Sequence, residues 1–366
     1  MQLPDDASVL SLNGTRILIT GGAGFIGSRL TKALSGCGAR ITVFDNLLEQ
    51  VHGASPAIDL PAELVVGDLR DRGALAAVVE QCNPEIVIHL AAETGTGQSA
   101  DEPSRYAAVN VVGTAQLIEI LRDRATPPER FLLAATRAVY GEGAYRDAAG
   151  DLVSPAPRDI ENMDKGRFEV FDACGNVLQP VPTDVDLPPS PGSVYGSSKL
   201  MQEYLLAQSP SPWKNVILRL QNVYGPGQSL RNPYTGVLSI FCSQAMRGEQ
   251  INVYEDGRIY RDFVFVDDVV AAFVAGCHEP GMLGRTFNIG TGKPVSILDA
   301  ARLIMRELGL DEESVAINGM FRPGDIRYAV ADISRTLATG AWSPAISHEE
   351  GIARLVRWAR EEFEAL

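Results

Sequence analysis

The sequence lacks any apolar run long enough to cross a membrane as a helix. Such a helix needs about 20 consecutive, mostly apolar residues, and no stretch of the 366 residues approaches that length. Residues 1–6 show neither the basic start nor the apolar run of a secretory signal peptide. These absences predict a cytoplasmic protein that has no membrane as a partner.

Cysteine and histidine are scarce. The chain has five cysteines and four histidines. No two cysteines form a C-x-x-C pair, so we expect reduced thiols, as in a cytoplasmic protein, and no metal site. Cys174 lies alone in a long loop and cannot hold zinc by itself. His89 has no metal-ligand or catalytic-triad spacing around it, which favours a structural role.

Positive charge is also in deficit. The chain has 32 Lys and Arg residues against 46 Asp and Glu residues, a formal net charge of −14. This balance argues against nucleic acid and against an anionic membrane surface as partners. It does not exclude an anionic small molecule, because a few local arginines are enough to bind one.

The sequence does have a glycine turn between a predicted strand and a predicted helix. An apolar run at residues 17–20 is followed by three glycines at intervals of three and then by a helical pattern. The glycines allow a sharp turn, a close approach of a phosphate and tight packing of the helix on the strand. The helix N-terminus then points at a pyrophosphate. The expected cofactor contacts of this turn are Gly21, Gly24, Phe25, Ile26 and Gly27.

An acidic residue completes this dinucleotide-binding pattern. Residues 39–44 form the next apolar run, and Asp45 and Asn46 follow it. A carboxylate at this distance from the glycines is placed to bind a ribose 2′-hydroxyl and to repel a 2′-phosphate. We therefore expect NAD rather than NADP as the cofactor, with Asp45 and Asn46 among its contacts.

Two further predicted strands, at residues 63–67 and 85–90, end in residues suited to the same cofactor. Asp68 is placed either to reach the adenine amine or to cap the next helix, and both roles stay open. Small residues after the second strand would let the backbone lie against the cofactor. The further expected cofactor contacts are Asp68, Leu69, Leu90, Ala91, Ala92, Asn110, Tyr195 and Lys199.

Strands and helices alternate through the first part of the chain. Further strands are expected at residues 130–134 and 215–220, and helices at 106–121 and 194–207. This alternation predicts an α/β fold with a doubly wound parallel sheet of the Rossmann type, in which ligands bind beyond the carboxyl ends of the strands.

A second, smaller domain is expected to be interlaced with the first. We assign residues 14–224 to the dinucleotide-binding domain and residues 225–366 to a substrate-binding domain, which includes short strands near 251–254 and 287–289. Residues 262–276 are expected to return to the first domain. The segment 144–190 breaks the strand and helix rhythm and is interpreted as an insertion that contains a small hairpin.

Three residues form a candidate catalytic group. Tyr195 and Lys199 are four residues apart in a predicted helix and so share one face. The lysine ammonium favours the phenolate and lowers the tyrosine pKa, which makes tyrosine a usable base. Thr136 follows the predicted strand at 130–134 and is placed to hold a substrate hydroxyl.

These motifs resemble the extended short-chain dehydrogenases/reductases that act on nucleotide sugars. The resemblance covers nearly the whole chain and includes several motifs in the family's order. The motifs are GGAGFIG at 21–27, GDLR at 67–70, HLAA at 89–92, Asn110-Val111, Tyr195-x-x-x-Lys199, LRLQNVYGP at 218–226, RDFVFVDD at 261–268, FNIG at 287–290 and RPGD at 322–325.

The resemblance implies a mechanism and a substrate class. Tyr195 takes the proton of a sugar C4 hydroxyl while NAD⁺ accepts the C4 hydride, which leaves a 4-keto sugar. The substrate is a nucleotide-diphosphate sugar, and a homodimer pairs through the two long helices at 106–121 and 194–207. The substrate-binding residues that the resemblance implies are Thr136, Asn222, Arg261, Arg322 and Asp325.

The two residues after Thr136 help to distinguish among the reactions that members of this family catalyse. In the family's dehydratases an Asp-Glu pair follows the catalytic threonine, whereas Arg137 and Ala138 follow it here, so dehydration is not expected. Residues 90–99 and 225–236 look most like dTDP-L-rhamnose 4-epimerases. The leading hypothesis is therefore C4 epimerisation. A nucleotide-sugar 4-ketoreductase, another oxidoreductase of the family and a non-catalytic NAD-sensing protein stay as alternatives.

Overall fold

The structure is a computed structural model that describes residues 12–54, 56, 58–230 and 236–364. The segment examined for a signal peptide, residues 1–6, lies outside the described residues, as do residues 231–235 of the motif at 225–236. Within the described part of the chain, no helix is both long and apolar enough to span a bilayer.

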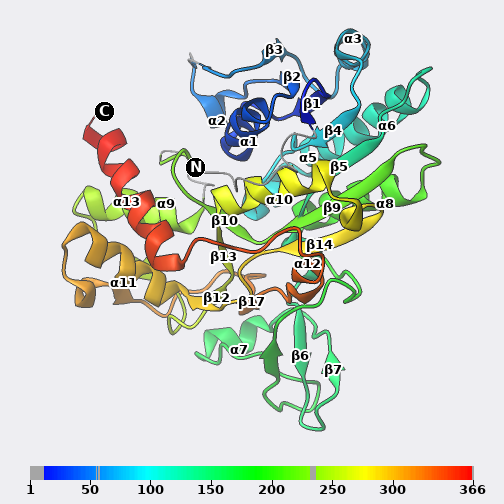
Figure 1. Cartoon of the computed structure of the whole chain (residues 1–366). Coiled ribbons are helices and arrows are strands. Elements are labelled where there is room, and N and C mark those ends of the chain that lie inside the picture. Colours follow the sequence, from blue (N-terminus) through cyan, green and yellow to red (C-terminus); the bar gives the residue numbers. More distant parts are fainter. Residues whose placement is uncertain (1–11, 55, 57, 231–235, 365–366) are drawn as a thin grey trace.

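A seven-stranded parallel sheet forms the centre of the larger lobe (Figure 1). Its strand order is β14-β9-β5-β4-β1-β2-β3, with every neighbouring pair parallel. This order reverses direction on either side of β1, as in a doubly wound sheet, and confirms the predicted fold class. The strands are β1 (Arg16–Thr20), β2 (Arg40–Asp45), β3 (Glu63–Val66), β4 (Ile86–His89), β5 (Arg130–Thr136), β9 (Lys214–Leu220) and β14 (Arg285–Ile289).

The last strand of this sheet corrects the expected domain organisation. Residues 287–289 were assigned to the smaller domain, but β14 pairs with β9 at the edge of the main sheet, with Phe287 opposite Leu218. Phe287 and Ile289 are fully buried in the main core. The seventh strand therefore comes from the region of the chain that was assigned to substrate binding.

Helices cover both faces of the sheet. On one face, α1 (Phe25–Gly36) and α10 (Val266–His278) pack against each other and share a hydrophobic core with the strands. On the other face, α3 (Arg72–Cys82), α6 (Thr114–Arg122) and α8 (Val194–Gln208) form a second core. Helix α10 thus packs on the main sheet although most of its sequence neighbours belong to the smaller lobe.

The helix expected at residues 106–121 is divided into three parts. A short α5 (Pro103–Tyr106) leads into a π-helix, η2 (Ala107–Gly113), which continues into α6. A π-helical turn widens the helix by one residue and often occurs near functional sites. Here it contains the buried Asn110.

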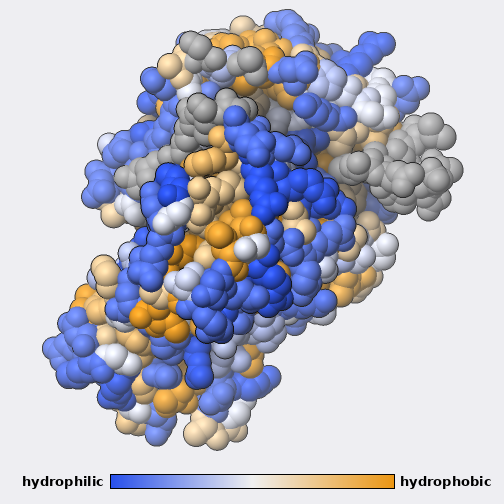
Figure 2. Space-filling view, turned by 90° about the vertical axis from the view of Figure 1, so that its left-hand side faces the viewer, coloured by the Kyte–Doolittle hydropathy of each residue, from blue (hydrophilic) through white to orange (hydrophobic). Residues whose placement is uncertain are grey.

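The smaller lobe is built on three helices: α9 (Val237–Met246), α11 (Ile297–Leu308) and α13 (His348–Glu364). Figure 2 shows the side of the molecule that carries them, on which hydrophilic residues cover much of the surface and hydrophobic residues gather near its centre. The short strands of this lobe are β10 (Asn222–Tyr224), β11 (Asn252–Val253), β12 (Tyr260–Arg261), β13 (Phe263–Phe265), β15 (Val295–Ser296), β16 (Ala316–Ile317) and β17 (Tyr328–Ala329). Shorter helices elsewhere are α2 (Glu49–His52), α4 (Thr96–Asp101), α12 (Ser334–Leu337), η4 (Pro280–Met282) and η5 (Glu312–Ser314).

The insertion at 144–190 is more ordered than the sequence suggests. Its predicted hairpin is confirmed by the antiparallel bridge between Phe171 and Val177. A three-stranded antiparallel sheet and a short helix accompany the hairpin and extend from the main body (Figure 1). These elements are β6 (Ala144–Arg146), β7 (Leu152–Val153), α7 (Ile160–Asp164) and β8 (Gln179–Val181).

Candidate active site

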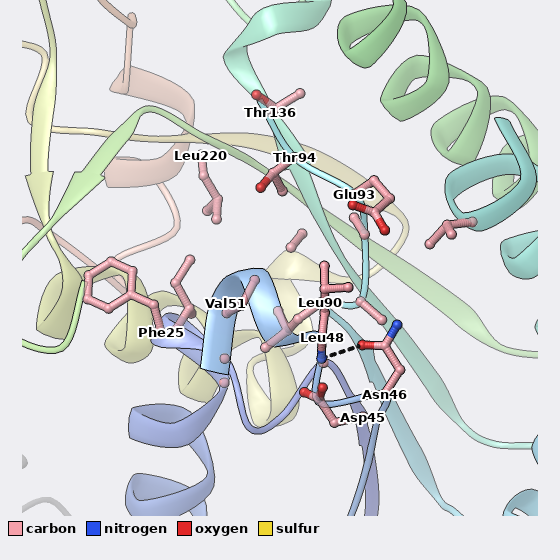
Figure 3. Close-up of a pocket in the computed structure, with 18 of the residues that line it drawn as sticks. Phe25, Asp45, Asn46, Leu48, Val51, Leu90, Glu93, Thr94, Thr136 and Leu220 are labelled. Atoms are coloured by element: carbon pink, nitrogen blue, oxygen red, sulfur yellow. Dashed lines mark hydrogen bonds between the residues drawn. The ribbon is translucent and has the colours of Figure 1, made fainter. Parts of the chain in front are cut away.

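A pocket of about 450 Å³ lies beyond the carboxyl ends of the main strands. Asp45 and Asn46 line one end, and Thr136, Thr94 and Glu93 lie toward the other (Figure 3). Its position matches the expected ligand crevice of a doubly wound sheet. The expected site residues that line it are Gly21, Gly24, Phe25, Ile26, Gly27, Asp45, Asn46, Asp68, Leu69, Leu90, Ala91, Ala92, Thr136, Tyr195 and Lys199.

The glycine turn forms a cradle of bare backbone in this pocket. Gly21 has a φ of +71°, and a Cβ there would lie 2.6 Å from the backbone nitrogen of Ala91. A Cβ on Gly27 would lie 2.3 Å from the carbonyl oxygen of Gly21. Helix α1 begins at Phe25 without a side-chain cap, and among the described residues no side chain bonds to its first amides. These features fit the pyrophosphate of a dinucleotide.

Asp45 presents a fixed carboxylate at the end of β2. Its oxygens accept hydrogen bonds from the backbone amides of Ala23 (3.0 Å) and Leu47 (3.0 Å), and His52 lies 3.6 Å away. Burial raises the pKa of Asp45, but the hydrogen bonds from His52, Leu47 and Ala23 outweigh it and hold the pKa below its usual value. The carboxylate is therefore ionised and placed to accept hydrogen bonds from a ribose.

Asp68 lines the same end of the pocket and does not cap a helix. Its carboxylate accepts hydrogen bonds from the Arg70 side chain (2.7 and 2.8 Å) and from Asn46 (3.2 Å). The hydrogen bond from Arg70 is the main cause that lowers the pKa of Asp68. The N-cap of α3 is Asp71, which accepts from the amides of Gly73 and Ala74. The capping role considered for Asp68 was therefore wrong.

Thr136, Tyr195 and Lys199 come together at the opposite end. Thr136 ends β5, and the other two residues lie on α8. The Tyr195 side chain is hydrogen-bonded to Thr136. Lys199 is only 3% exposed, and burial lowers its pKa to about 7 although Glu203 acts in the opposite direction.

The environment of Tyr195 differs from the expected one. Burial raises the pKa of Tyr195, and the contributions that lower it come from the hydrogen bond with Thr136 and from the charge of Arg137. The sequence pointed to Lys199 as the cation that favours the phenolate. In the structure, desolvation of this lysine reduces its own tendency to stay charged.

Asn110 lies beside the site but does not line the pocket. It is fully buried, and its amide donates to the Glu93 carbonyl (3.0 Å) and to the Ser198 hydroxyl (2.9 Å). Its side-chain oxygen accepts from the Glu93 amide at 2.8 Å. Asn110 thus fixes the loop after β4 to α8, which carries Tyr195 and Lys199.

His89 has the structural role that was expected. It is fully buried, and its ring nitrogens are hydrogen-bonded to Thr20 (2.7 Å) and Thr114 (2.9 Å). Burial lowers its pKa to about 3, so the ring is neutral at physiological pH.

The four other expected substrate residues lie outside the pocket lining, toward the smaller lobe. Arg261 and Asp325 form an ion pair of 2.6 Å. Arg322 is exposed and lies 5.0 Å from the centre of the Tyr254 ring. The side-chain oxygen of Asn222 is buried and has no hydrogen-bond partner among the described residues. The structure therefore joins Arg261 to Asp325 through their side chains. Arg322 meets Asp325 through the backbone, where its carbonyl accepts the Asp325 amide at 3.1 Å, while its guanidinium lies over Tyr254.

The pocket also contains residues that are not among the expected site residues. Glu93 and Thr94 follow β4 and come directly after the small residues Ala91 and Ala92. A polar stretch follows them in the sequence, and this pattern was the signal that could have identified them as site residues. Most of the others are apolar or lie in loops, where sequence pattern carries little information. The remaining lining residues of this kind are Phe44, Leu48, Val51, His52, Gly67, Val109, Ala134, Ala135, Leu220, Gln221, Val223, Gln228, Ser229 and Gly236.

Comparison with known proteins agrees with this architecture. Residues 17–159 and 169–290 match the NAD dependent epimerase/dehydratase family. The chain is 44% identical over 365 residues to the dTDP-L-rhamnose 4-epimerase of Burkholderia thailandensis, covering 98% of this chain and 99% of the relative.

Two solved structures show the same fold. The UDP-glucose 4-epimerase of Thermotoga maritima, with UDP-glucose, has a TM-score of 0.77 at 29% identity, covering 95% of this chain and 99% of the other. The Thermus thermophilus UDP-glucose 4-epimerase complex with NAD has a TM-score of 0.72 at 27% identity, covering 94% and 99%. The glycine cradle and the Asp45 carboxylate fit NAD, and the expected cofactor is confirmed. The chain belongs to the NAD-dependent epimerase/dehydratase family.

Proposed function

We propose that this enzyme is an NAD-dependent C4 epimerase of a nucleotide-diphosphate sugar, with dTDP-L-rhamnose and dTDP-6-deoxy-L-talose as its pair of substrates. The observation that carries the proposal is the placement of Tyr195 and Thr136 at the end of the pocket opposite Asp45. We assign Asp45 to the adenosine ribose of NAD, so the nicotinamide end of the cofactor would be held at the Tyr195 end of the pocket. The choice of sugar rests on the likeness to the Burkholderia thailandensis enzyme.

Each residue of the catalytic group has a distinct part in this reaction. Bound NAD supplies a hydride acceptor and donor at the sugar C4. Thr136 holds the C4 hydroxyl, and Tyr195 takes its proton as general base and returns it at the end of the cycle. Lys199, buried beside Tyr195 on α8, would hold the nicotinamide ribose of the cofactor and supply positive charge when protonated. The 4-keto sugar then turns over and is reduced on its other face.

The residues after Thr136 support epimerisation over dehydration. Elimination across C5 and C6 needs an acid and a base near those carbons. Arg137 and Ala138 occupy the positions where the dehydratases have a carboxylate pair, and neither can serve as one. Epimerisation at C4 needs only a base that removes and returns the hydroxyl proton, the role proposed for Tyr195, and a cofactor that accepts and returns the hydride.

The remaining site assignments are part of the same proposal. The dinucleotide lies along the pocket residues of the larger lobe, and the nucleotide sugar reaches across to the smaller lobe. There we assign contacts with the nucleotide diphosphate and its ribose to Asn222, Arg261, Arg322 and Asp325. The ion pair between Arg261 and Asp325 supports this part, because it holds the Arg261 guanidinium in one orientation.

We also infer a homodimer that pairs through α8 and the neighbouring helical segment η2–α6. Three large apolar side chains on these adjacent helices are exposed: Val112 (50%), Met201 (43%) and Tyr204 (41%). Apolar side chains gathered on a helical face are typical of surfaces covered by a partner. The cytoplasmic location expected from the sequence stays a prediction.

A screen of nucleotide sugars tests the proposed function. Purified protein is incubated separately with dTDP-, UDP- and GDP-linked hexoses and deoxyhexoses without added cofactor, and the products are assigned by NMR. We expect inversion at C4, with the fastest turnover on the dTDP-6-deoxyhexose pair, and an ultraviolet signal of NAD released on denaturation. A strict requirement for stoichiometric NADPH would show that the enzyme is a ketoreductase instead.

A further inference from the structure

Arg137 is a cation at the active site that the proposed chemistry leaves unused. It directly follows Thr136 and begins the short 3₁₀-helix η3 (Arg137–Tyr140). Its guanidinium donates a hydrogen bond from Nη2 to the carbonyl oxygen of Gly141 at 2.9 Å. The side chain is half-buried, and its charge acts on both Tyr195 and Arg261. Arg137 therefore lies near both Tyr195 and Arg261, beside the pocket rather than in its lining.

The carboxylates that attract Arg137 are engaged by other arginines. Glu142 forms an ion pair with the Arg158 side chain at 3.4 Å, and its carboxylate accepts a hydrogen bond from the backbone amide of Arg327 at 3.1 Å. The Asp325 carboxylate accepts a hydrogen bond from Nη2 of Arg261 at 2.6 Å. In the part of the chain that the structure describes, no carboxylate oxygen lies within 4.0 Å of the Arg137 guanidinium, so this cation has no ion pair.

This arrangement is unfavourable without an anion. Removal of a charged group from water is costly unless a counter-charge or hydrogen bonds replace the solvent. Burial lowers the pKa of Arg137 to about 10, and the neighbouring charge of Arg261 acts in the same direction. The group is still protonated at neutral pH, so the site holds an incompletely compensated positive charge.

A second observation points to a ligand at the same place. Tyr145, on β6, is only 1% exposed, and its hydroxyl has no hydrogen-bond partner among the described residues. Its electrostatic interactions with Arg137 and Arg261 place it in the same cluster. A buried hydroxyl without a partner is a rare and costly feature that a bound acceptor would remove.

We propose that Arg137 binds the diphosphate of the nucleotide sugar, with the Tyr145 hydroxyl donating to the same anion. This inference deepens the function proposed above and rests on it. A planar guanidinium fork suits two phosphate oxygens at once. Because Asp325 already neutralises Arg261, Arg137 supplies the larger share of uncompensated positive charge. The residue that excludes dehydration then also holds the substrate.

Calorimetric titration of the NAD-loaded protein with nucleotides tests this assignment. The probes are dTDP, UDP and GDP, with dTMP, UMP and GMP as the matching monophosphates. Arg137→Gln should weaken diphosphate binding at least tenfold, which equals about 1.4 kcal/mol, and change monophosphate binding less. Arg137→Lys keeps the charge but loses the fork, so its affinity should be intermediate. The control, Arg146→Gln, removes an exposed arginine of the insertion and should bind like wild type. Among the described residues, the Arg146 side chain bonds only to the Gly150 carbonyl.

The outcomes separate this inference from the proposed function. If the wild type binds none of the three diphosphates, both fail. If the wild type binds one of them and Arg137→Gln binds it equally well, only the assignment of Arg137 fails. A variant with unchanged affinity but reduced kcat would likewise contradict diphosphate binding and place Arg137 at the chemical step. Retained NAD and an unchanged circular dichroism spectrum show that a variant is folded. If Arg137→Gln does not fold, equal affinities of Arg137→Lys and wild type overturn the assignment.

Discussion

At the scale of single residues, burial at the Tyr195 end of the pocket disfavours the charged forms of the ionisable side chains there. Burial raises the pKa of Tyr195 and lowers that of Lys199, so desolvation disfavours the phenolate and the ammonium alike. The hydrogen bond with Thr136 and the charge of Arg137 act against this effect at Tyr195. The proton affinity of the base thus depends on residues at the end of β5, as well as on its neighbour on α8.

This balance predicts how a substitution of Thr136 changes the pH profile. The general base must be deprotonated, so kcat/KM rises with pH through the Tyr195 pKa. Thr136→Ala removes a hydrogen bond that lowers this pKa, so the rising limb should move to higher pH. Thr136→Ser keeps the hydroxyl and should retain the wild-type limb. If the rise of kcat/KM with pH occurs at the wild-type position in both variants, this rise does not reflect the deprotonation of Tyr195.

Tyr195→Phe tests the identity of the base itself. Loss of a positioned general base typically lowers the rate by about 10²–10⁴-fold. We expect a fall in kcat of that size with NAD still bound, because the glycine cradle and Asp45 are unchanged. The measurement is steady-state turnover together with the NAD content of the purified variant. Undiminished turnover would refute the role of Tyr195.

At the scale of elements, the insertion is tied to the smaller lobe by buried charges. Arg158 pairs with Glu255 through two hydrogen bonds of 2.8 and 2.9 Å. It also donates to the backbone carbonyl of Asp325 at 2.7 Å, and Asp325 in turn holds Arg261. The insertion thereby helps to orient a residue of the proposed diphosphate site.

Arg158→Met should therefore destabilise the protein strongly. It leaves Glu255, whose side chain is fully buried, without one of its two arginine partners. Breaking a buried ion pair from one side costs about 3–5 kcal/mol. The control, Arg306→Met, removes an exposed pair with Glu312 and should cost about 1 kcal/mol or less. Denaturant unfolding of both variants measures the difference, and equal losses would contradict the structural role of Arg158.

The same elements show what sequence could predict and what it could not. The glycine turn, Asp45 and the Tyr195–Lys199 pair were found because each depends on local spacing. The position of β14 depends on pairing with β9, which is distant in the chain, and the contact of Arg158 with Glu255 joins residues 97 positions apart. No local pattern encodes such contacts, so the insertion sheet and the place of the seventh strand in the main sheet emerged only from the structure.

At the scale of the whole molecule, two lobes meet along the ligand pocket. The larger lobe supplies the glycine cradle and the proposed catalytic residues, and β10 to β13 lead into the smaller lobe with the proposed substrate residues. Because β14 and α10 return to the main sheet, the lobes are linked at several points of the chain. Such linkage favours a rigid relation between cofactor and substrate sites.

The proposed dimer makes a prediction at this scale. Met201→Glu places a charge on the exposed face of α8, where a partner would bury it at high cost. We expect wild-type protein to have the mass of a dimer by light scattering and the variant to have that of a monomer. Met320→Glu alters a methionine of the smaller lobe that is more exposed than Met201 (57% against 43%) and should stay dimeric. Identical masses for all three proteins would contradict the proposed interface.

The central claim is that the enzyme recycles a bound NAD to invert C4 of its substrate. The most direct measurement uses the dTDP-6-deoxyhexose carrying deuterium at C4, incubated with purified protein in ordinary water without added cofactor. We expect the C4 epimer with its deuterium retained, because the same hydride leaves and returns. Loss of the label to solvent, or no epimer unless a reduced cofactor is supplied, would contradict it.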